Sequence, residues 1–181
     1  MRIVRSRPSG SADRRHPGAW QVMPARVEDA ELVHRIMREA YLEYDGAVDP
    51  PMSASGESVA QVADAIRRGG AVLAWDGTTP VGSARYRLSS EFVHIKRVSV
   101  LPSWRGRGIA TAMLLHIEHL ALTQGRGQAR LHVRMSLSHN VELYRRVGYR
   151  LLEVKAHPRG QDVVGTLVKQ LRKRHGREEV L

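Results

Sequence analysis

Cysteine is absent from the 181 residues, and its absence excludes several classes of site. Without thiols there is no disulfide framework, thiolate zinc site, iron–sulfur cluster or cysteine nucleophile. Long apolar runs are missing too. The stretch Ile109–Leu115 is interrupted by Thr111 and is much shorter than the ~20 residues that a membrane-spanning helix needs. No bilayer span is therefore expected.

Negative charge is scarce relative to positive charge, and the formal net charge is +11. Such an excess first suggests a nucleic-acid partner. Residues 1–20 carry +4 and residues 169–181 carry +3, however, so most of the excess lies at the two ends. Charged ends are usually solvated tails, so nucleic acid is not expected as the main partner. The arginine-rich start lacks the apolar segment of a secretory signal, which favours a cytoplasmic protein.

The composition fits one globular domain, with 42% hydrophobic and 26% charged residues. We expect a disordered basic tail over 1–18, a folded domain over 19–170 and a basic tail over 171–181. Hydrophobic spacing predicts helices over about 29–44, 58–68, 108–123 and 138–147. Strands are expected over about 20–23, 71–75, 81–88, 92–100, 129–135, 149–154 and 163–168. This order predicts a single α/β domain whose mixed sheet has six or seven strands and about four helices around it.

A glycine-rich basic turn is the most informative segment. An apolar strand ends near Pro102, and a long helix begins inside the turn Arg105–Ala110. A helix start presents unpaired N–H groups and partial positive charge, and glycines let an anion approach the backbone closely. The turn is therefore predicted to bind phosphate, with Arg105 and Arg107 as further cationic donors.

Two common phosphate loops do not fit this turn. A Walker loop needs a lysine, and none occurs between Lys96 and Lys155. A dinucleotide fingerprint needs a third glycine, and Thr111 stands at that position. ATP binding by a Walker loop is excluded, and nicotinamide binding is poorly supported.

Two motifs give a specific resemblance. The loop Arg105–Ala110 resembles the [RQ]-x-x-G-x-[GA] pyrophosphate loop of the GCN5-related N-acetyltransferase (GNAT) superfamily. The segment Asn140–Tyr149 resembles the same superfamily's N-x-x-x-Y-x-x-x-G-[YF] segment. The two motifs occur in the family's order, separated by a helix and a strand.

The resemblance implies a GNAT-like fold in which two parallel strands splay to admit acetyl-CoA as co-substrate. The backbone of Val98, Ser99 and Val100 would pair with the pantetheine arm. The loop residues that would hold the pyrophosphate are Arg105, Gly106, Arg107, Gly108, Ile109 and Ala110. Asn140 would contact the cofactor arm, and Tyr144 would direct its hydroxyl to the thioester sulfur.

Direct transfer to an amine needs a proton donor for the thiolate and a route for the amine proton. Tyr144 is the candidate acid, because a phenol with a pKa of about 10 keeps its proton at neutral pH. His94 stands where many relatives carry a glutamate and is the candidate base; Glu91 is the fallback. Strand alternation predicts that His94 and Val98 share a face.

Two segments of the sequence predict acceptors of opposite charge. The acidic and aromatic segment 41–52 would attract a cationic amine, whereas the basic hairpin His157–Gly160 would suit a carboxylate. His116 and His119 are three residues apart, unlike the four-residue spacing of zinc-protease helices, so no metal is expected.

The resulting hypothesis is an N-acetyltransferase that moves acetyl directly from acetyl-CoA to a primary amine of a small molecule, peptide or protein. The alternatives are a non-catalytic acyl-CoA-binding regulatory module and a nucleic-acid-associated protein acting through its basic tails. The expected partners are acetyl-CoA and an amine acceptor. A homodimer is a further alternative, since dimers that pair through their sheet edges are common in the family.

Overall fold

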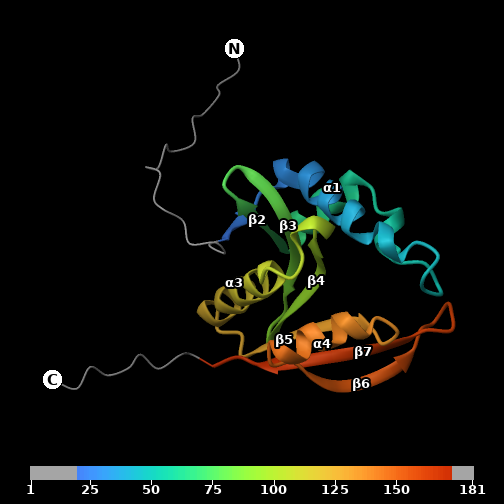
Figure 1. The fold of residues 1–181 in the computed structure, drawn as a ribbon. Helices are drawn as coiled ribbons and strands as arrows, with labels where there is room; N and C mark the ends of the chain where they lie inside the picture. The colour runs from blue at the N-terminus through green and yellow to red at the C-terminus, as the bar shows by residue number, and fades with distance from the viewer. Residues whose placement is uncertain (1–19, 173–181) are drawn as a thin grey trace, which may run out of the picture.

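The computed structural model describes residues 20–172, in which helices flank a seven-stranded sheet (Figure 1). In chain order the strands are β1 (Gln21–Ala25), β2 (Gly70–Asp76), β3 (Thr79–Leu88), β4 (Phe92–Val100), β5 (Gln128–Arg134), β6 (Arg150–Ala156) and β7 (Val163–Gln170). The α-helices are α1 (Ala30–Tyr41), α2 (Val59–Arg68), α3 (Ile109–Thr123) and α4 (Ser138–Arg146). The predicted α/β domain is confirmed.

The strand order is β1-β2-β3-β4-β5-β7-β6, and β4–β5 is the parallel pair of this sheet. Pairing between them covers Phe92–Ile95 and Gln128–Leu131. Beyond those residues β4 continues to Val100 and β5 to Arg134 without pairing to each other. The two strands therefore splay, as the family resemblance implies.

Apolar side chains form a cluster on each face of the sheet. On one face Met113, Leu114 and Ile117 of α3 are fully buried. On the other, Val33 and Met37 of α1 pack with residues of α2. The stripe of each helix that faces the sheet is thus removed from water, which is the main favourable term in folding.

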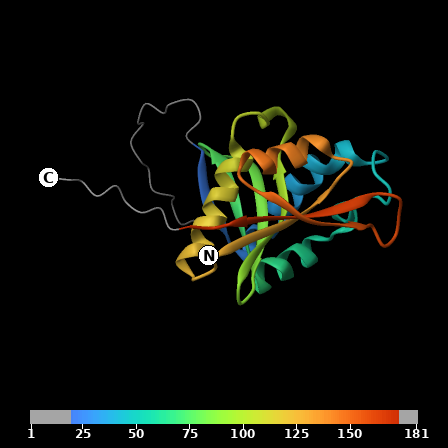
Figure 2. The same cartoon turned by 90° about the horizontal axis from the view of Figure 1, so that it is seen from below.

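The turn between β6 and β7 lies beside the loop that follows α1, as both ribbon views show (Figures 1 and 2). The Asp162 amide donates to the Asp49 carbonyl over 3.0 Å, and the Gln161 amide donates to the Asp49 carboxylate over 3.0 Å. Arg134 on β5 donates to the Pro50 carbonyl over 2.9 Å. These contacts connect the two segments that gave conflicting cues to the acceptor.

A bulge in β4 contradicts the prediction that His94 and Val98 lie on the same face of the sheet. Arg97 has φ 54, and the register between β3 and β4 shifts around it. Val98 packs in the same cluster as Val93 and Ile95, so alternation is reversed beyond the bulge. His94 therefore faces the opposite side of the sheet from Val98, and the prediction that they share a face is wrong.

The expected basic tail 1–18 lies outside the described residues, as do residues 173–181 of the expected C-terminal tail. Leu171 is described: it is buried, and its amide donates to the Gly127 carbonyl over 2.8 Å. Within 20–172, no helix has the length and apolarity to cross a membrane.

A buried polar cluster joins α3 to the C-terminal strand. The Tyr149 hydroxyl donates to one carboxylate oxygen of Glu118 over 2.9 Å, and the Lys169 ammonium donates to the other carboxylate oxygen of Glu118 over 2.6 Å.

The substitution Glu118→Leu leaves both donors unpaired, so we expect it to lower the free energy of unfolding by ~3 kcal/mol in urea titrations. The exposed helix pair Glu142–Arg146 provides the control, since Glu142→Gln should cost less than ~0.5 kcal/mol. Equal losses in the two variants would contradict this account of the cluster.

Candidate active site

A cleft of about 1030 Å³ opens where β4 and β5 separate. Its walls come from α1, the second half of α2 and the segment before that helix, the loop before α3, and α4. Most of the residues that the sequence singled out line it: His94, Val98, Val100, Arg105, Gly106, Gly108, Ile109, Ala110, Asn140 and Tyr144. One cleft thus brings together two motifs more than 30 residues apart in the chain.

The glycine loop presents open backbone donors at the start of α3. Gly106 and Gly108 have φ 73 and φ 82, a region that favours glycine. Among residues 20–172, and apart from the chain neighbours, no atom lies within 4 Å of where a Cβ would stand at either position. The first helical donor is the Ala112 amide, which bonds the Gly108 carbonyl over 2.9 Å. Within residues 20–172 the preceding amides, from Gly106 to Thr111, have no backbone acceptor, and this arrangement fits a pyrophosphate.

The Arg105 side chain supports the loop through contacts with β4 and α1. Its guanidinium donates to the carbonyls of Val100 over 3.2 Å and Ala40 over 2.9 Å, and it pairs with Glu43 over 2.5 Å. Those contacts engage each of the three guanidinium nitrogens that the sequence assigned to phosphate. The structure therefore gives the Arg105 side chain a positioning contact between α1 and the loop.

Two tryptophans hold the other side of the loop. The Trp20 indole N–H donates to the Arg107 carbonyl over 2.8 Å, and its ring meets Trp104 edge to face with centroids 6.0 Å apart. The Arg107 guanidinium lies 4.8 Å from the centre of the Trp104 ring. The Arg107 carbonyl is thereby turned toward Trp20.

Tyr144 lies on α4, half-buried in the cleft wall. Its ring packs edge to face on Tyr149, with centroids 6.1 Å apart. Its hydroxyl makes no hydrogen bond within the described part of the chain. Burial raises the pKa of Tyr144, so the phenol stays protonated at neutral pH and can donate.

Asn140, one turn before Tyr144, donates its side-chain amide to the Tyr44 hydroxyl over 3.3 Å. The His139 ring stacks on Tyr44, with Nε2 3.2 Å from the same hydroxyl. Burial raises the pKa of Tyr44 to about 12. Sequence reasoning placed Tyr44 in a segment facing the acceptor; the structure brings it to the α4 motif.

His94 and His132 meet edge to face on the neighbouring strands β4 and β5, with centroids 4.7 Å apart. Burial lowers the pKa of His94 to about 4, and the positive charge of Lys96 adds to the shift. His94 is thus neutral at pH 7 and can accept a proton. Glu91, the fallback base, is exposed and does not line the cleft.

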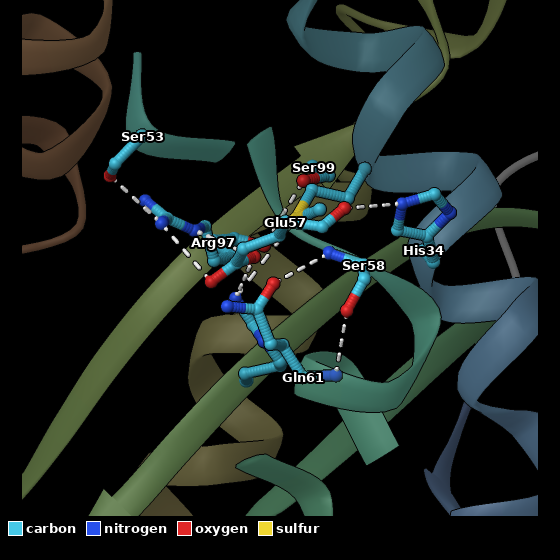
Figure 3. A network of polar contacts seen from close by, with 9 residues as sticks. His34, Ser53, Glu57, Ser58, Gln61, Arg97 and Ser99 are labelled. Atoms are coloured by element: carbon cyan, nitrogen blue, oxygen red, sulfur yellow. Dashed lines mark hydrogen bonds and ion pairs between the residues drawn. The ribbon is translucent and has the colours of Figure 1, made fainter. Parts of the chain in front are cut away.

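Sequence reasoning gave no role to a partly buried ionic cluster formed by Glu57, Arg85 and Arg97. Figure 3 shows Glu57 and Arg97 of this cluster. Glu57 precedes α2, whose start is fixed by reciprocal hydrogen bonds between Ser58 and Gln61. No local pattern could reveal the cluster, because its members are 28 and 40 residues apart.

His116 and His119 are on α3, away from the cleft-lining residues. Across residues 20–172 there is no group of three or more histidine, aspartate or glutamate side chains that could hold a metal ion.

Comparison with known proteins identifies the family of this chain and solved structures that share its fold. Residues 32–149 match the acetyltransferase (GNAT) family. The uncharacterized N-acetyltransferase YjcF of Bacillus subtilis (strain 168) is 29% identical over 84 residues, which are 46% of this chain. The match spans 58% of YjcF, so the chain covers little more than half of that relative.

Solved structures share the fold over nearly their whole length. The PaiA N-acetyltransferase of Thermoplasma acidophilum, solved with coenzyme A, has a TM-score of 0.71 at 19% identity, covering 84% of this chain and 99% of that one. Ard1 of Thermoplasma volcanium has a TM-score of 0.69 at 16% identity, covering 86% and 99% respectively. At these identities the likeness concerns the fold.

Proposed function

The chain belongs to the acetyltransferase (GNAT) family, and we propose that it is an N-acetyltransferase that moves an acetyl group from acetyl-CoA directly to a primary amine. The observation that carries the proposal is the row of open amides from Gly106 to Thr111 in the same cleft as Tyr144. A pyrophosphate on those amides leaves the splay between β4 and β5 for the pantetheine arm. The arm would pair with the backbone of β4 beyond Ile95, at Val98, Ser99 and Val100, where β5 no longer does.

The reaction forms a bond from the amine nitrogen to the acetyl carbon and breaks the bond from that carbon to sulfur. Tyr144 gives its proton to the departing thiolate, and solvent restores the phenol. The amine must first lose a proton. A lysine-like amine with a pKa near 10.4 is neutral at pH 7 at a cost of ~4.6 kcal/mol, so a proton acceptor helps. His94 is the proposed acceptor, either directly or through water. It is neutral at pH 7, and its pKa of about 4 makes it a weak base, so it takes the proton as the bond to the acetyl carbon forms and makes the nitrogen more acidic.

The lowered pKa of His94 predicts a pH dependence. The neutral, basic form of His94 persists down to a pH of about 4. The plot of log kcat/KM against pH should therefore change slope near pH 4 because of His94, and not near its ordinary pKa of ~6.5. In His94→Gln the break near 4 should vanish and kcat fall. A break near 6.5 that this variant removes would contradict the assigned environment.

Stability should follow the same titration. Between the ordinary histidine pKa of ~6.5 and the folded value of about 4, only the unfolded chain binds the His94 proton. The free energy of unfolding therefore falls as pH drops through that window. Urea titrations of His94→Gln should show a smaller fall.

Turnover tests the proposal against its alternatives. Free thiol release from acetyl-CoA, followed across a panel of amines, should depend on both the amine and Tyr144. Acetyl-CoA binding without release from any amine would favour the regulatory module. Nucleic-acid binding that is abolished by removing residues 1–18 and 172–181, with acetyl transfer left intact, would favour the alternative that acts through the tails.

A further inference from the structure

Two guanidinium groups share one carboxylate in the wall of the cleft. Arg85 contacts Glu57 over 2.6 Å, and Arg97 contacts its two oxygens over 3.4 and 3.3 Å. The side chain of Arg85 is 8% exposed, whereas those of Arg97 and Glu57 are each 21% exposed. The cluster therefore carries one surplus positive charge, and Arg97 is its more accessible arginine.

Arg97 has donor capacity left over. Its Nε and Nη2 bond Glu57, and Nη2 also donates to the Ser53 hydroxyl over 2.9 Å (Figure 3). Its Nη1 donates to no group within residues 20–172. The β4 bulge directs this side chain to the face of the sheet that carries α1 and α2. A guanidinium with a free edge in a cleft is suited to a carboxylate.

Neighbouring charges reinforce that preference. Lys96 and Arg87 line the same cleft and form no ion pair with any residue of the described chain. Besides Glu57, the acidic residue that lines it is Asp64, which is already paired with Arg67 and Arg68.

The acidic segment that suggested a cationic amine is engaged within the protein. Glu43 pairs with Arg105, Asp45 accepts from the Ser55 hydroxyl, and Asp49 accepts from the Gln161 amide. Arg105 compensates the charge of Glu43, and none of these three carboxylates is among the described residues that line the cleft. The charges that do line it therefore favour an anionic acceptor.

We propose that the acceptor is a small-molecule primary amine that carries a carboxylate, and that Arg97 binds this carboxylate with help from Lys96. The proposal rests on the acetyltransferase function above. It gives the two ends of the cleft different anions: pyrophosphate at the start of α3, and the acceptor carboxylate beside the β4 bulge.

The experiment compares matched acceptors that differ in the carboxylate. Thiol release is measured for amino acids with small, acidic and aromatic side chains, each beside its carboxamide, and for the polyamine spermidine. We expect at least one pair in which kcat/KM for the carboxylate exceeds that for the amide by ~10-fold, the size of one charge-assisted hydrogen bond. Arg97→Gln should reduce that ratio to below ~3 while the CoA dissociation constant is unchanged; Arg97→Lys should keep part of it.

Arg67→Gln is the matched control, because it removes the same charge from α2 at a residue that does not line the cleft. Its carboxylate preference should equal that of the original protein. Equal rates within every pair, faster release with amides or spermidine, or release with these but with no carboxylate would overturn the proposal. Failure of the transferase function itself is distinguishable, since no amine of any kind, spermidine included, would then release thiol.

Discussion

Replacing Gly108 by glutamate should raise the dissociation constant for coenzyme A at least ~100-fold, equivalent to ~2.7 kcal/mol. The open space where a Cβ would stand at Gly108 adjoins the amides proposed to hold the pyrophosphate. A carboxylate there places like charges together, and such a juxtaposition costs several kcal/mol. Calorimetric titration of CoA measures the change.

Backbone strain needs a separate control, because Gly108 has φ 82 and any side chain is disfavoured there. Gly125 has φ 76, also with nothing within 4 Å, and follows the opposite end of α3. Gly125→Glu adds the same charge in a similar conformation away from the cleft. It should bind CoA as the original protein does. Wild-type affinity in Gly108→Glu would remove the loop from the proposed binding site.

Tyr144→Phe should lower kcat by ~100-fold or more, within the range that positioned acid catalysis contributes. The ring and its edge-to-face contact with Tyr149 stay, and only the proton donor is lost. The KM for acetyl-CoA should therefore change little. Steady-state thiol release with a saturating amine gives both constants.

Tyr149→Phe is the matched control on the neighbouring ring. Its hydroxyl donates to Glu118 in the core, so this variant should lower the free energy of unfolding and leave kcat nearly unchanged. A Tyr144→Phe protein with undiminished kcat would refute the acid assignment and turn attention to Tyr44, whose hydroxyl lies beside Asn140.

Much of the fold is predictable because its signals are local. Hydrophobic periodicity locates the helix at 109–123, and glycines next to a helix start locate the turn that we propose binds phosphate. Both follow from residues within one or two turns of each other. The same holds for Tyr144 and Asn140, whose spacing on α4 places them near one another.

The remaining features depend on contacts between distant residues. The bulge at Arg97 reverses strand alternation, so simple counting put Val98 on the wrong face relative to His94. Arg105 has the motif's sequence, yet it contacts Glu43, 62 residues earlier. The Glu57 cluster joins the segment before α2 to β3 and β4, and its charges are brought together only when the chain folds. These are the features that bear on the acceptor.

Titration of the full chain with acetyl-CoA and with CoA, followed by thiol release on adding amines, tests the central claim most directly. The account predicts 1:1 binding of both with micromolar dissociation constants, and release that needs an amine and is lost in Gly108→Glu. Absence of binding by either compound, or release that Gly108→Glu leaves intact, would contradict it.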